Sequence, residues 1–221
     1  MVDEMKHLRP LSAVLKEFPA FLQKIEWKKS GDDEFCSNPR FGKVLHGVIC
    51  EDGGQPLYDQ PVIDFKECAM VIPYVKNENG KLIKVFMIKS ERPASGAFFW
   101  EFPGGFFEQG ETPEKGALRE LQEETGLIGE EAIFLGKLNP ERVLFNKAEV
   151  HVFAAELKES EELKDELEEE HSQNESKILE RKFFSISEIK SLLLDKGEYC
   201  GVTLAAWALF QAHFEKEFLI S

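Results

Sequence analysis

The most constraining feature of this sequence is the acidic segment 105–127, which carries the signals for both ends of a helix. Thr112 is a favoured N-cap residue, and Pro113 fits the first helical position, where a missing N–H leaves no hydrogen bond unmade. Gly126 suits the left-handed turn that follows many helix C-termini. The sequence therefore predicts a helix that begins after Thr112 and ends at Gly126.

The predicted helix gathers three acidic residues on one side. Glu120, Glu123 and Glu124 are spaced i, i+3 and i+4, so their side chains are neighbours, while Leu118 and Leu121 point elsewhere and can be buried. Like charges at this spacing repel by about 0.2–0.5 kcal/mol per pair. A solvated surface would explain an acidic run. A site for Mg²⁺, Mn²⁺ or Ca²⁺ would also explain it, because these cations prefer carboxylate oxygens.

The spacing of the defined residues separates these two interpretations. A glycine is followed after five residues by a glutamate, and after seven more by an Arg-Glu-Leu-Gln-Glu-Glu-Thr-Gly-Leu run, at Gly105, Glu111 and 119–127. This pattern resembles the Nudix hydrolase signature at every defined position. The preceding 100–104 (WEFPG) resembles the strand that leads into the signature loop in that family.

The resemblance implies a site for a divalent metal, Mg²⁺ or Mn²⁺. Its ligands would be three side chains and one backbone carbonyl, from Glu120, Glu123, Glu124 and Gly104. Arg119 is expected to pair with Glu111 or with a helix acid and so to hold the loop. The glycines at 104 and 105 are expected to let the backbone approach the metal–phosphate unit, because they carry no Cβ.

The resemblance also extends to residues outside the predicted helix. The catalytic set that it implies is Glu111, Arg119, Glu120, Glu123 and Glu175. Glu175 is the leading candidate for the general base, with Glu169 and Glu170 behind it. The substrate-binding set is Arg92, Glu101 and Gly105.

The apolar pattern predicts a mixed α/β fold. Buried or alternating apolar segments predict strands, and Asn79-Gly80 predicts a hairpin between the first two of the main series. The expected strands are 44–50, 69–75, 82–88, 98–102, 133–138, 150–157 and 183–184. Strands on both sides of one helix, followed by closing helices, predict an α/β/α sandwich with a mixed sheet, as the Nudix resemblance also implies.

The remaining segments fall at the two ends of the chain. We expect residues 1–65 to form an N-terminal extension or small subdomain, with helical spacing at 11–25, and residues 66–221 to form the Nudix domain. Ser187 is expected to cap a helix through Leu194, and an apolar helix is expected at 203–218. The acidic run 158–170 is best interpreted as a solvated segment.

The composition limits the classes of partner. The net charge of −14 argues against a nonspecific nucleic-acid surface, because phosphate backbones are bound by Lys and Arg. No apolar run is long enough to cross a membrane, and no apolar signal region occurs at the N-terminus. We therefore expect a cytoplasmic protein, and the Nudix resemblance implies that it acts on a small nucleotide. The resemblance also implies a homodimer formed through the N-terminal segment, as is common in family members of this length.

The resemblance favours an enzyme that hydrolyses a nucleoside diphosphate linked to another group, with ADP-ribose or a nucleotide sugar as substrate. Two departures bear on that substrate: no Ser-Pro-Gly-Gly loop follows Pro140, and the acidic loop at 173–175 is sparse. The alternative is an enzyme that hydrolyses oxidised nucleoside triphosphates, which the Trp-Glu-Phe-Pro-Gly-Gly segment also resembles. A further alternative, from another class, is a nucleotide-binding sensor without catalysis.

Overall fold

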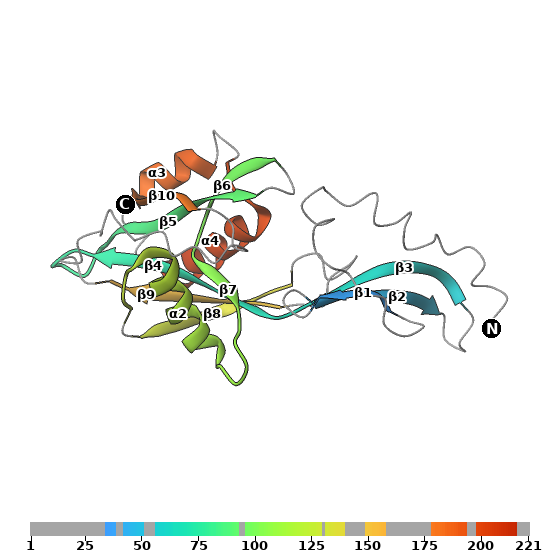
Figure 1. Cartoon of the computed structure of the whole chain (residues 1–221). Helices are drawn as coiled ribbons and strands as arrows, with labels where there is room; N and C mark the ends of the chain where they lie inside the picture. The colour runs from blue at the N-terminus through green and yellow to red at the C-terminus, as the bar shows by residue number, and fades with distance from the viewer. Residues whose placement is uncertain are drawn as a thin grey trace.

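The computed structural model describes residues 34–38, 42–50, 56–92, 96–129, 131–139, 149–157, 178–193 and 198–215. Within these residues the chain forms two sheets and three helices (Figure 1). The helical spacing at 11–25, the acidic run 158–170 and Glu175 lie outside the described residues.

The larger sheet has seven strands and is mixed. Its main path runs β10-β5-β4-β9-β8, while β6 pairs with β5 and β7 pairs with β4. Among the described pairs, β4 and β9 are parallel and the others are antiparallel. The strands are β4 (Cys68–Lys76), β5 (Leu82–Arg92), β6 (Ala97–Glu101), β7 (Gly104–Phe106), β8 (Ala132–Leu138), β9 (Val150–Glu156) and β10 (Ile178–Ser185).

The central strand β4 changes partner along one of its edges. Its last residues pair with β5, in the register Tyr74↔Val85, whereas its first residues pair with β7, in the register Ala69↔Gly105. The β7 strand leads directly into the loop before α2 (Pro113–Thr125). This arrangement brings the loop and the helix to the end of β4 where β7 has replaced β5.

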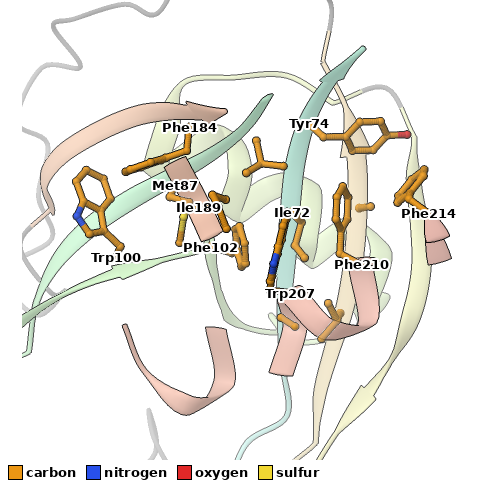
Figure 2. Packing of buried hydrophobic residues seen from close by; sticks show 14 of the residues in the cluster. Ile72, Tyr74, Met87, Trp100, Phe102, Phe184, Ile189, Trp207, Phe210 and Phe214 are labelled. Carbon is orange, nitrogen blue, oxygen red and sulfur yellow. The ribbon is translucent and has the colours of Figure 1, made fainter. Parts of the chain in front are cut away.

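Helices cover both faces of the larger sheet (Figure 1). On one face, Ala117 and Leu121 of α2 pack against Val71 and Phe153 from the sheet. On the other face, α3 (Ile186–Ser191) and α4 (Gly201–His213) pack on a second core, in which Trp207 and Phe210 lie beside Ile72 (Figure 2). The predicted α/β/α sandwich with a mixed sheet is confirmed.

The smaller sheet is antiparallel and lies in the N-terminal part of the chain. It consists of β1 (Glu34–Asn38), β2 (Gly42–Cys50) and β3 (Pro56–Phe65), with β2 in the middle. The sequence pattern predicted only the central strand. The other two were missed because their residues show neither a long apolar run nor clear alternation.

Two predictions about the helices on the second face need correction. The N-cap of α3 is Ser185 and not Ser187, because Glu188 is three residues after Ser185 and forms a reciprocal capping box with it. Helix α4 begins at Gly201, two residues before the predicted start, with Cys200 at its N-cap position. No helix in the described part of the chain is long and apolar enough to span a membrane.

Candidate active site

Helix α2 has the ends that the sequence predicts. The hydroxyl of Thr112 accepts a hydrogen bond from the backbone N–H of Lys115, and Pro113 occupies the first turn. At the other end, Gly126 adopts a left-handed conformation with φ of 73°, and its N–H donates to the carbonyl of Gln122. The buried Leu121 fixes the rotation of the helix on the sheet and leaves the acidic side toward β7 and its loop.

Arg119, on α2, holds the preceding loop through several hydrogen bonds. It donates two hydrogen bonds to the carboxylate of Glu111, at 3.0 and 3.1 Å, and one to the carbonyl of Phe106 at 3.0 Å. It also donates to Glu120 and to Glu123, each at 2.9 Å. The hydrogen bonds from Arg119 lower the pKa of Glu111, so this carboxylate stays charged and keeps the loop closed on the helix. The predicted Arg119–Glu111 pair is therefore present.

Glu124 occupies a different environment, against the backbone of β7. Its Oε2 accepts a hydrogen bond of 2.8 Å from the N–H of Gly104. Burial raises the pKa of Glu124 above the ordinary carboxyl value, and the neighbouring charge of Glu120 adds to this effect. A carboxylate that loses hydration next to another carboxylate is stabilised by a bound cation.

The two glycines of β7 leave no room for a side chain. A Cβ on Gly105 would lie 2.3 Å from Oε1 of Glu120, and a Cβ on Gly104 would lie 2.3 Å from the carbonyl oxygen of Ala69. The Glu120 carboxylate thus rests directly on bare backbone. The expected approach of this backbone to a metal–phosphate unit stays a prediction. With Glu120 and Glu124 both at this backbone, the donor set fits a hard divalent cation.

The three helix acids do not form one compact cluster. The Glu123 side chain is 59% exposed and shares the Arg119 guanidinium with Glu120, which is 14% exposed. Glu124 faces the backbone of Gly104 instead. The helix therefore presents one solvent-facing carboxylate and two that line the β7 backbone, and the role of each as a ligand is a proposal.

Arg92 and Glu101 lie together beside the helix. They come from the antiparallel strands β5 and β6, and Nε of Arg92 is 3.1 Å from both carboxylate oxygens of Glu101. Glu101 is buried, whereas nearly half of the Arg92 side chain is exposed. The charges of both residues also act on Glu124. Glu101 thus orients Arg92 and holds its guanidinium beside α2.

One residue of the site escaped the sequence analysis. Arg181 on β10 donates a hydrogen bond of 2.7 Å from Nε to the backbone carbonyl of Glu124, at the C-terminal end of α2. A cation at this end of a helix complements the helix dipole. Its position depends on the pairing of β10 with β5, which places segments far apart in the sequence side by side. No local pattern could have identified it.

The comparisons with known proteins point to one family. The NUDIX domain family matches residues 66–203. ADP-sugar pyrophosphatase of Mus musculus is 56% identical over 48 residues, which are 22% of this chain and 22% of that protein. The 8-oxo-dGTP diphosphatase of Escherichia coli strain K12 is 37% identical over 76 residues, 34% of this chain and 57% of that protein.

A second bacterial protein and a solved structure complete the comparison. The 8-oxo-dGTP diphosphatase of Proteus vulgaris is 69% identical over 29 residues, 13% of this chain and 26% of that protein. All three relatives are thus matched over less than two thirds of their length. A crystal structure of an ADP compounds hydrolase superposes with a TM-score of 0.56 at 15% identity, covering 87% of this chain and 92% of that one, and shows a shared fold. The family match covers residues 66–203, which are more than half of this chain. The chain therefore belongs to the NUDIX domain family.

Proposed function

We propose that this protein hydrolyses the pyrophosphate bond of a nucleoside diphosphate linked to another group, with the help of a divalent cation. The observation that carries the proposal is the pair of carboxylates, Glu120 and Glu124, held against the side-chain-free backbone of Gly104 and Gly105. A phosphoanhydride resists attack because its oxygens are negative. A site of carboxylates alone would repel it further, so the arrangement requires a cation between the two.

The residues that would hold Mg²⁺ or Mn²⁺ are Glu120, Glu123, Glu124 and the carbonyl of Gly104. A cation bound there neutralises charge on the phosphates and makes a water molecule more acidic. We assign catalytic roles to Glu120 and Glu123 and the general base to Glu175, which lies outside the described residues.

The chain's own contribution is to position these groups. Arg119 ties Glu111 to α2 and shares its charge with Glu120 and Glu123, so that two acids remain close without a metal. We assign Arg92, which the buried Glu101 orients, to contact with a phosphate or carboxyl group of the substrate, because a guanidinium matches the geometry of these anions. The bare surface of Gly105 admits the diphosphate close to the backbone.

ADP-ribose or a nucleotide sugar is the proposed substrate class. The short segment shared with the mouse ADP-sugar pyrophosphatase and the shared fold with an ADP compounds hydrolase support it. The runner-up is an oxidised nucleoside triphosphate, because the segment shared with the Escherichia coli 8-oxo-dGTP diphosphatase is longer. We further propose that residues 1–65 contribute to a homodimer.

The deciding experiment is a hydrolysis panel with Mg²⁺, in which the products are identified by chromatography. The panel contains ADP-ribose, other nucleotide sugars, dinucleoside polyphosphates and 8-oxo-dGTP. The proposal expects ADP-ribose to give AMP and ribose 5-phosphate. Preferential release of pyrophosphate from 8-oxo-dGTP would establish the runner-up instead. Binding of a nucleotide without turnover would identify a sensor.

The cation is tested separately from the substrate. A ligand that binds only the folded state stabilises it by RT ln(1 + [L]/Kd), about 2.7 kcal/mol at a hundred times Kd. Thermal melts with Mg²⁺ or Mn²⁺, compared with melts in a chelator, are expected to show this shift. Absence of the shift in both the free protein and its nucleotide complex would contradict a cation site on α2.

A further inference from the structure

The parallel strands β4 and β9 begin side by side, and each is preceded by a glutamate. Their register pairs Cys68 with Val150 and Ala69 with His151, so Glu67 and Glu149 are neighbours just before the first pair. A backbone hydrogen bond of 3.2 Å from Cys68 to the carbonyl of Glu149 holds this end together. Because side chains alternate along a strand, Glu149 and His151 lie on the same face.

His151 is a buried polar side chain whose Nε2 lacks a hydrogen-bond partner among the described residues. The residue is only 7% exposed, and its ring packs against Phe107 and Phe134. Nε2 lies 3.3 Å from Oε2 of Glu67, in a geometry that makes no hydrogen bond. Buried polar atoms without partners are rare in folded proteins, since each costs free energy. A bound ligand would satisfy Nε2 of His151.

We propose that Glu67, Glu149 and His151 form a second metal site, for a borderline divalent ion such as Zn²⁺. One ligand atom from each residue lies within 4.8 Å of the others. Two donors on a tetrahedral Zn²⁺ are about 3.3–3.6 Å apart, because Zn–N and Zn–O bonds are close to 2.0–2.2 Å. The Nε2 to Oε2 separation of 3.3 Å lies at the short end of this range. An imidazole with two carboxylates favours Zn²⁺ over Mg²⁺, which prefers oxygen ligands alone.

The competing explanation is a pair of ordinary contacts. Nζ of Lys137, on the neighbouring strand β8, lies 2.6 Å from Oε2 of Glu149, and His151 faces Glu67. This explanation leaves the imidazole nitrogen without a hydrogen bond. Lys137 is nearly half exposed, so its ammonium group can swing into water when an ion takes its place. Lys137 and a metal ion therefore compete for Glu149.

The second site is distinct from the signature acids and lies next to their loop. None of Glu120, Glu123 and Glu124 belongs to the cluster. Phe107, in the segment between β7 and α2, donates its backbone N–H to the carbonyl of Glu67 at 3.4 Å and places its ring 5.3 Å from that of His151. An ion on Glu67 and His151 would fix the point where the loop leaves the sheet.

The test is metal binding by the full chain after removal of metals with a chelator. Zn²⁺ is titrated by calorimetry in a Glu120→Gln background, which weakens the signature site, with excess Mg²⁺ present. Co²⁺ serves as an optical probe, because its visible absorption responds to imidazole ligation. The variants are Glu67→Gln, His151→Gln and Lys137→Met. Glu78→Gln, at an exposed acid in the turn that follows the other end of β4, is the matched control.

Glu67→Gln and His151→Gln are each expected to weaken Zn²⁺ binding at least about tenfold and to change the Co²⁺ spectrum. Lys137→Met is expected to strengthen Zn²⁺ binding, and Glu78→Gln to leave it unchanged. Glu67 is more than half exposed, so its variant decides the question if His151→Gln fails to fold. Zn²⁺ affinity within twofold of the background protein for Glu67→Gln would overturn the proposal, as would a Co²⁺ spectrum that folded His151→Gln protein leaves unchanged.

Discussion

The two faces of the larger sheet are packed with different kinds of side chain. The face under α3 and α4 is rich in aromatic rings. Phe210, for example, packs with Tyr74, Trp207 and Phe214. The face under α2 is lined mainly by aliphatic and small side chains such as Ala69 and Val71. Carboxylates and arginines surround the edge of the face under α2.

The difference separates stability from chemistry. Aromatic rings bury a large area and hold the sheet and its helices together. Small residues under α2 bring that helix close to the sheet, so its acids reach the backbone of β7. We therefore expect changes on the aromatic face to alter the free energy of unfolding, and changes at the edge of α2 to alter turnover. Four predictions test this division.

Phe210→Ala should have the largest effect, because it empties the centre of the aromatic face. The expected loss is about 3–5 kcal/mol of unfolding free energy, measured by urea denaturation. Turnover per folded molecule should change little. Leu204→Ala, on the exposed side of the same helix, is the control and should cost about 0.5 kcal/mol or less. A strong loss of turnover in fully folded Phe210→Ala protein would break the division.

Glu124→Gln should have the opposite effect, with a large loss of turnover and little change in the free energy of unfolding. Removal of a proposed metal ligand is expected to lower kcat by at least about 100-fold. The metal-free protein should be as stable as the parent or slightly more so, because one like charge on α2 is gone. Steady-state kinetics and thermal melts in chelator check the two parts. Full activity with a sharply lower Tm would mean that Glu124 is structural.

Arg119→Lys tests which property of a residue on α2 matters for turnover, its charge or its hydrogen bonds. Lysine keeps the charge but cannot reproduce the five-donor fork that reaches Glu111, Glu120 and the carbonyl of Phe106. We expect Mg²⁺ affinity or kcat to fall about 10- to 100-fold, as for other groups that support metal ligands. Activity measured against Mg²⁺ concentration distinguishes the two. Unchanged kinetics would show that the charge alone is sufficient.

Ser185→Ala should have the smallest effect and concerns the aromatic face again. Loss of the capping box on α3 is expected to cost about 1 kcal/mol of unfolding free energy, with turnover unaffected. Ser187→Ala, two residues further along the chain, is the matched control. It should lower the free energy of unfolding by less than Ser185→Ala does. Equal losses for the two variants would contradict the assignment of Ser185 as the N-cap.

Local patterns in the sequence were sufficient for the parts of the structure that are local. The ends of α2 follow from Thr112, Pro113 and Gly126, and the contact between Arg119 and Glu111 was implied by the Nudix resemblance. The core strands were predicted because their apolar runs are buried on both faces. The position of the α3 cap was missed by two residues because two serines lie close together and only one is three residues before Glu188.

The rest of the site depends on pairings that no local pattern records. Arg92 and Glu101 were predicted separately as substrate-binding residues, and the structure shows that the second orients the first. Arg181 reaches α2 only because β10 pairs with β5. The cluster of Glu67, Glu149 and His151 arises from the parallel register of β4 and β9, which joins two distant segments.

The parallel pairing of β4 with β9 also has a consequence for how the chain folds. The hydroxyl of Tyr74 and the carboxylate of Glu156, which this pairing brings together, are 82 residues apart, and α2 lies inside the loop that must close between them. Closing long loops slows folding, whereas a capped helix forms quickly. We expect α2 to acquire helical structure before the sheet is complete, and divalent-cation affinity to appear only with the slowest refolding phase. Stopped-flow refolding followed by circular dichroism and by cation binding would separate these two events in time.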